Sequence, residues 1–178
     1  MLEIAIWLSE TKWSIALLES LYMYPWIESA HVLSICFFIG ILLFVDLRLM
    51  GVAFTKLPIS EMNKKVLPWS LFGFGLMALT GFLLFYAIPV RSYQNIFFRF
   101  KVILILFAGL NAFLFHRQMK LEGMNWDEGE SIPKSVHLKA AASLVIWSGV
   151  IISGRMIAYN WFDCDRQPQP EWVNWAAG

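Results

Sequence analysis

Four long apolar stretches, separated by short polar segments, dominate the chain. They run over residues 25–49, 68–90, 95–117 and 136–161. A helix needs about 20 mostly apolar residues to cross a hydrocarbon core of about 30 Å, and each stretch is long enough. Because irregular backbone cannot face lipid, the pattern predicts an all-α integral membrane protein whose four spanning helices pack as a bundle. Pro25 and Pro68 suit the first turn of their helices, where a missing amide hydrogen costs nothing.

The composition agrees with a membrane protein. Of the 178 residues, 58% are hydrophobic and only 15% are charged, and the mean hydropathy is +0.60. A soluble domain of this size has a larger fraction of charged residues and a smaller fraction of apolar residues. We therefore expect a single membrane domain over residues 1–178, with the lipid bilayer as its main partner.

The two ends of the chain carry tryptophans among mixed polar and apolar residues. Residues 1–22 alternate at roughly helical spacing and include Trp7 and Trp13, which predicts an amphipathic helix at the outer membrane interface. A signal peptide is not expected, because the start lacks basic residues and Glu3 precedes a short apolar run. The tail 162–178, with Trp172 and Trp175, is expected on the same face. Packing on a partner subunit is the alternative for both ends.

Basic residues indicate the orientation. One side of the membrane holds Arg48, Lys56, Lys64, Lys65, Arg117, Lys120, Lys134 and Lys139, and the other holds Lys12, Arg91, Arg99 and Arg166. The excess of eight against four places the first set in the cytoplasm by the positive-inside rule. The expected location is the bacterial inner membrane, with both termini on the periplasmic side.

Ionisable residues inside spanning segments usually face the bundle interior and mark a site. Positions eighteen apart return to the same helical face at 100° per residue. Glu28 and Asp46 therefore define one stripe of the first span. We interpret Asp46-Leu47-Arg48 as an anchor that closes this span at the inner face.

The fourth span has a stripe of small and polar residues by the same arithmetic. It contains His137, Ala141, Ser148 and Arg155. Such a face predicts close approach of another backbone or of a flat cofactor.

In the third span His116 shares a face with Ile105, Gly109 and Ala112, whereas Asn111 is predicted to point elsewhere. The small residues leave room beside the imidazole, as a macrocycle lying along the helix would require. The second span adds further small residues, namely Gly73, Gly75 and Gly81.

Histidines suggest a cofactor. His116 and His137 both lie near the cytoplasmic face and could supply the two axial ligands of a b-type haem. His31 differs from them in depth by roughly 20 Å, at about 1.5 Å of rise per residue, and would belong to a second, outer site. Its expected companions are Glu28, Lys101 and Arg155, the two cations neutralising haem propionates.

Each of these residues also has a purely structural interpretation. His137 could be a solvated residue at a loop end, and His116 could extend to the inner surface. His31 could make only a hydrogen bond to Glu28, and Arg155 could be the ion-pair partner of Glu28.

A wider pattern of polar and small residues extends along nearly the whole chain. It comprises Tyr24-Pro25, Glu28-Ser29, His31, Asp46-Leu47-Arg48, Gly51, Lys101, Asn111, His116, Gly154-Arg155 and Ala158-Tyr159. This pattern resembles a family of small bacterial inner-membrane proteins classed as a domain of unknown function. The resemblance covers nearly the whole chain and implies four spans, but it supplies no activity. The family pattern has no histidine at His137, which favours His31 and His116 as separate centres. The layout is also similar to that of cytochrome b561-like and copper-resistance membrane proteins.

Three functions follow as hypotheses. The first is a haem b electron carrier that passes electrons between quinol and an outer-side partner. The second is a non-catalytic subunit that anchors a larger membrane complex. The third is a copper-handling protein centred on His31 and Glu28, with Cys36 and Met156 as further ligands. The histidines His31, His116 and His137 are the candidate metal ligands.

Other functions find no support in the sequence. A hydrolase or transferase needs a nucleophile and a base arranged together, and no such arrangement is visible. We therefore favour a carrier or accessory subunit over an enzyme. Nucleic-acid binding is not expected, because the net charge is only +1 and the basic residues are dispersed. Either a homo-oligomer or a subunit of a complex is compatible with the sequence.

Overall fold

The computed structural model describes residues 2–127, 132–159 and Glu171, and for residues 122–127 it describes the backbone alone. In this part of the chain there are seven helices and no strand. The helices are α1 (Leu2–Ser9), α2 (Lys12–Glu19), α3 (Met23–Leu49), α4 (Ile59–Ala87), α5 (Pro89–Gln94), α6 (Ile96–Asp127) and α7 (Lys134–Ala158). Four of them, α3, α4, α6 and α7, are long and apolar enough to cross a membrane. The predicted all-α, multi-pass membrane protein is confirmed.

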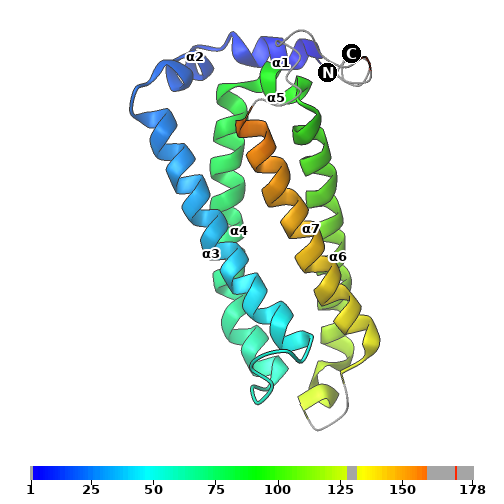
Figure 1. Ribbon diagram of the computed structural model, residues 1–178. Coiled ribbons are helices and arrows are strands. Elements are labelled where there is room, and N and C mark those ends of the chain that lie inside the picture. Colours follow the sequence, from blue (N-terminus) through cyan, green and yellow to red (C-terminus); the bar gives the residue numbers. More distant parts are fainter. Residues whose placement is uncertain (1, 128–131, 160–170, 172–178) are drawn as a thin grey trace.

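The four long helices form a bundle of two hairpins (Figure 1). Helix α3 packs along α4, and α6 packs along α7. The short helices α1, α2 and α5 lie across one end of the bundle, which we call the capped end. The opposite end, where α3 and α6 finish and α4 and α7 begin, is the far end.

Glycines allow the close contacts within each hairpin. A Cβ atom added to Gly73 of α4 would lie 2.9 Å from Phe37 Cδ1 of α3, and one added to Gly149 of α7 would lie 2.9 Å from Leu104 Cδ1 of α6. Small residues matter here because helices in lipid associate through close packing rather than through escape from water.

Two clusters of buried apolar side chains join the hairpins. One lies toward the far end and contains Leu49, Ile59, Phe115, Val136 and Ala140. The other crosses the middle of the bundle and contains Phe38, Met77, Ala108, Trp147 and Val150. Because α3, α4, α6 and α7 all contribute to the clusters, the four helices share one core.

The start of α4 differs from the prediction. The helix begins at Ile59, so Pro68 lies inside it rather than in its first turn. The additional turns bury Ile59 and Met62 against the bundle, and this burial stabilises helix beyond the apolar stretch. Pro25 does lie in the first turn of α3, as predicted.

The buried face of α7 also differs from the predicted stripe. The buried residues are Val136, Ala140, Ser143, Trp147, Val150 and Ser153. Ser148 and Arg155 are exposed instead. The eighteen-residue arithmetic identifies positions that share a face, but packing decides which face turns inward, and here it is the face with Trp147 and Val150.

The first 22 residues form two short helices rather than one. Thr11 separates them, and its side chain caps α2 by accepting a hydrogen bond from Ser14 N. Hydrogen bonds join this segment to α4: Thr11 Oγ1 lies 2.7 Å from Tyr86 Oη, and Ser14 Oγ donates to Tyr86 O at 2.8 Å. Trp7 and Trp13 are exposed, and the location of this segment at the membrane surface stays a prediction. The tail 162–178 lies outside the described residues, apart from Glu171.

Candidate functional site

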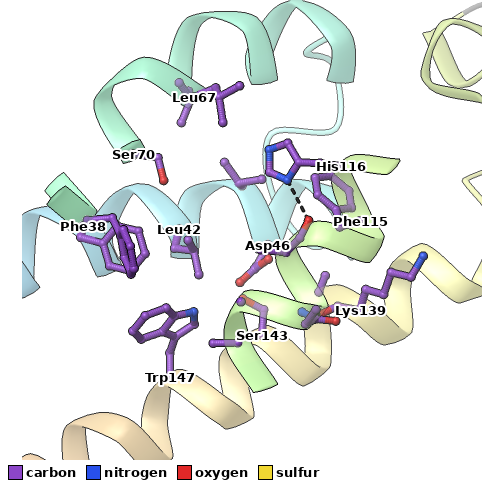
Figure 2. A pocket seen from close by; sticks show the side chains of 18 of the residues that line it. Phe38, Leu42, Asp46, Leu67, Ser70, Phe115, His116, Lys139, Ser143 and Trp147 are labelled. Carbon is purple, nitrogen blue, oxygen red and sulfur yellow. Dashed lines mark hydrogen bonds between the residues drawn. The ribbon is translucent and has the colours of Figure 1, made fainter. Parts of the chain in front are cut away.

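A cavity of about 260 Å³ lies between α3, α4, α6 and α7, in the half of the bundle toward the far end (Figure 2). Most of its lining is apolar. The polar lining residues are Asp46, Asn63, Ser70, Asn111, His116, Lys139 and Ser143.

Asp46 is the unusual residue of this cavity. Its side chain is only 6% exposed, and its Oδ2 atom is the one buried side-chain oxygen without a hydrogen-bond partner among the described residues. The Ser143 hydroxyl lies beside the same carboxyl group (Figure 2). Burying a polar group without a partner costs roughly 1–3 kcal/mol, and more for a charge. A carboxyl group held in this way is a candidate binding group.

The lysine of the cavity lining forms no ion pair with Asp46 among the described residues. Lys139 lines the cavity, but in Figure 2 its ammonium points away from Asp46. It donates instead to Gln118 Oε1 and to Leu114 O. The amide of Asn111 is also engaged, since its Nδ2 atom donates to Lys139 O at 3.0 Å. Asp46 thus faces the cavity without an ion-pair partner in the described structure.

His116 stands at the edge of the cavity. Its Nδ1 atom lies 2.9 Å from Ala112 O of the same helix, and this contact is the dashed line in Figure 2. A carbonyl oxygen only accepts, so the proton is on Nδ1. In the tautomer with this proton, the acceptor lone pair is on Nε2. Two of the residues that line the cavity, Asp46 and His116, carry acceptor atoms.

The opposite end of the cavity is aromatic. Phe38 and Trp147 meet edge to face with ring centroids 4.9 Å apart, and Phe38 and Phe74 lie 5.6 Å apart. All three rings line the cavity. The cavity is therefore amphipathic, with rings at one end and a carboxyl group toward the other.

His31 lies in a different setting, closer to the capped end. Its Nδ1 atom is 2.9 Å from Thr80 Oγ1, and the Thr80 hydroxyl donates to Leu76 O at 2.8 Å. The single hydroxyl proton is then used, so His31 Nδ1–H donates to Thr80. A Cβ atom at Gly81 would lie 3.0 Å from His31 Cε1. The imidazole is hydrogen-bonded and tightly packed on α4.

The predicted companions of His31 divide into two groups. Lys101 is half-buried and lies within electrostatic range of His31. Glu28 is exposed. Arg155 is also exposed, and its Nη2 atom donates to Tyr159 Oη at 2.9 Å. Of the three companions, the structure brings only Lys101 to His31, and in the described residues Glu28 and Arg155 form no ion pair.

The predicted axial pair makes local hydrogen bonds. His137 Nδ1 lies 3.2 Å from Pro133 O of its own helix start, and His137 is not part of the cavity lining. His116 is bonded to its own helix as described above. Within the described residues, no group of three or more His, Cys, Asp or Glu side chains could hold a metal ion. Cys36 is an exposed thiol, and Cys164 lies outside the described residues. Haem ligation stays a prediction.

The sequence does not single out Asp46 as a candidate site residue, and it predicts Asn111 on another face of α6 than His116. Asn111 lines the same cavity as His116, because a cavity enclosed by four helices admits a wide arc of each. A signal for Asp46 was present: it follows Leu42 by four residues, and Leu42 follows Phe38 by four. Residues at this spacing lie on one helical face, so the carboxyl group shares the face that carries Phe38 into the core. Arg48 lies at the end of α3, where its Nε atom donates to Leu57 O at 2.8 Å, and its role as an inner-face anchor stays a prediction.

Comparison with known proteins places the chain in a family. The model of the "Family of unknown function (DUF6644)" matches residues 20–160. No curated protein and no solved structure matches the chain. The looser likeness in layout to cytochrome b561-like and copper-resistance proteins stays a hypothesis. The chain, a four-span membrane protein, belongs to the family of unknown function DUF6644.

Proposed function

We propose that this protein binds the head of a quinol, taken from the bilayer, in the cavity around Asp46. The observation that carries the proposal is that Asp46, a residue of the mostly apolar cavity lining, has a buried Oδ2 atom without a hydrogen-bond partner among the described residues. Such an atom favours a ligand that brings its own hydrogen-bond donor.

The chemistry of a quinol complements this lining. A quinol carries two hydroxyl donors on one ring, and two residues of the cavity lining, Asp46 and His116, carry acceptor atoms. A hydrogen bond of this kind contributes about 0.5–1.5 kcal/mol. The ring itself would lie against Phe38 and Trp147, which suits offset or edge-on aromatic contacts.

The size of the cavity agrees with a single-ring ligand. Pockets for drug-sized ligands span roughly 300–1,000 Å³, and this cavity of about 260 Å³ lies just below that range. One substituted ring with two hydroxyls is smaller than a typical drug, whereas a porphyrin is larger. The cavity as it stands favours the quinol head.

The proposed setting is the bacterial inner membrane, with both termini on the periplasmic side. Lys56, Lys64 and Lys65 lie at the far end of the bundle, which the positive-inside rule assigns to the cytoplasm. The quinol head would then lie in the cytoplasmic half of the bilayer.

The experiment is a binding titration of the full-length protein in lipid nanodiscs. Quinol binding is followed by quenching of tryptophan fluorescence, with Trp147→Phe used to identify the signal of the cavity. Asp46→Asn should weaken binding at least tenfold. Glu28→Gln is the matched control, because Glu28 lies on the same helix but is exposed, and it should bind like the unaltered protein.

The oxidised ligand sharpens this test. A quinone of the same ring and tail has no hydroxyl donors, so it should bind at least tenfold more weakly than the quinol. Equal affinity for quinol and quinone, or unchanged affinity of Asp46→Asn, would contradict the proposal.

The remaining hypotheses have their own measurements. Haem binding and electron transfer predict Soret and alpha bands in reduced-minus-oxidised spectra of protein expressed with ample haem. Copper handling predicts bound metal that is lost in His31→Ala. An accessory subunit predicts that the chain purified alone is unstable or aggregated.

A further inference from the structure

Some residues that line the cavity are also exposed on the outside of the bundle. On α4 these are Leu71 and Phe74, and on α6 they are Gly109, Ala112 and His116. They lie along the boundary between α4 and α6, which we call the α4–α6 seam. The cavity therefore reaches the lipid-facing surface along this seam.

Gly109 leaves open space in the seam, because it has no side chain. A Cβ atom added to Gly109 would meet nothing within 4 Å. The surrounding surface of α6 is bulky by contrast, since Leu106, Leu110 and Phe113 are all large and exposed. The gap in side chains coincides with the place where the cavity opens.

At the other boundaries of the bundle, side chains are in close contact at the middle of the helices. Between α3 and α4, Gly73 lies directly against Phe37 and Phe38, and between α6 and α7, Gly149 lies against Leu104. Between α3 and α7, the rings of Phe38 and Trp147 are in edge contact. Close packing of this kind leaves no passage for a ring without rearrangement.

We infer that the α4–α6 seam is the lateral entrance through which the ligand passes from the bilayer, and that the glycine at position 109 sets its width. The inference rests on the proposed quinol binding and adds a requirement to it. With its head at Asp46, the ligand's apolar tail lies in the seam, between Leu71 of α4 and Ala112 of α6. The ligand class is thus a lipid-soluble quinol with an apolar tail.

The test compares two exposed glycines in nanodiscs. Gly109→Leu places a side chain in the entrance, and the association rate of a long-tailed quinol should fall at least tenfold. Gly75→Leu is the control, because a Cβ atom at Gly75 also meets nothing within 4 Å, Gly75 is exposed, and it does not line the cavity. Gly75→Leu should associate at the unaltered rate. Gly109→Ala should give an intermediate rate and serves as the readout if the leucine variant does not fold.

The outcomes separate the entrance from the site. If Asp46→Asn loses affinity while Gly109→Leu and Gly109→Ala associate at the unaltered rate, the entrance is wrong and the proposed function stands. If Asp46→Asn keeps full affinity, the proposed function fails and the entrance fails with it. Slowing by Gly75→Leu as large as that by Gly109→Leu would also overturn the entrance.

Discussion

Two polar regions share the interior of this bundle and differ in one respect. Near the capped end, His31 is hydrogen-bonded to Thr80 and packed against Gly81. Toward the far end, Asp46 has an unpartnered oxygen and faces a cavity. Both regions place ionisable groups within a membrane-spanning segment. The comparison indicates that intramembrane polarity alone does not single out a candidate site, whereas an unsatisfied group on a residue that lines a cavity does.

An apolar layer separates the two regions. Phe38, Met77 and Trp147 belong to the buried cluster that crosses the middle of the bundle. This layer closes the aromatic end of the cavity. It therefore separates the hydrogen bonds of His31 from the proposed ligand site at Asp46.

The largest expected effect comes from breaking this layer. Trp147→Ala should destabilise the protein by about 3–5 kcal/mol, because a large buried ring is replaced by a methyl group. The loss in the free energy of unfolding is measured by unfolding the protein in mixed micelles with an increasing share of denaturing detergent. Trp147→Phe is the control and should lose less than half as much. Equal stability of Trp147→Ala and the unaltered protein would show that the layer does not hold the two hairpins together.

Replacing the acid of one region and the imidazole of the other should have opposite effects on stability. Asp46→Leu should abolish quinol binding and raise the free energy of unfolding by roughly 1–3 kcal/mol, because it removes an unsatisfied buried group. His31→Leu should lower the free energy of unfolding, because it leaves the Thr80 hydroxyl without its donor. Both variants are compared by thermal unfolding. A loss of stability in Asp46→Leu would contradict the contrast between the two regions.

Glycine substitutions in α4 test how tightly the His31 ring is packed. Gly75→Ala should stabilise α4 by up to about 1 kcal/mol, the difference in helix propensity. The free energy of unfolding of Gly81→Ala should be lower than that of Gly75→Ala by about 1–3 kcal/mol, because the added Cβ atom crowds the His31 ring. Quinol affinity should not change in either variant. The stabilities of the two variants are compared by thermal unfolding. Equal stability would show that the His31 ring adjusts freely to the added methyl group.

The smallest effect concerns a single hydroxyl. Thr80→Val keeps the shape of the side chain but removes the acceptor of His31 Nδ1–H, which should lower the free energy of unfolding by about 1 kcal/mol. Thr80→Ser should restore most of the loss. Quinol binding at Asp46 should be unaffected, and a change in affinity would mean that the two regions are coupled.

Sequence reasoning predicted the larger features well and the site only in part. Spanning segments follow from local length and hydropathy, so the four spans were found within a few residues apart from the start of α4. His116, Gly109 and Ala112 were recognised as sharing a face with room beside it, and all three line the cavity. Asp46 was interpreted as an anchor, because the sequence does not reveal which side chains have partners.

The sequence by itself determined the class of protein, four apolar helices in a bilayer, since burying unpaired backbone in lipid leaves few other solutions. The tertiary structure alone decided that Trp147 rather than Ser148 faces inward on α7, and that Lys139 turns its ammonium toward Gln118. It also decided that the carboxyl group of Asp46 meets a cavity instead of a cation. The physical reason is that helical periodicity relates residues within one helix, whereas partners and empty space arise only where four helices meet.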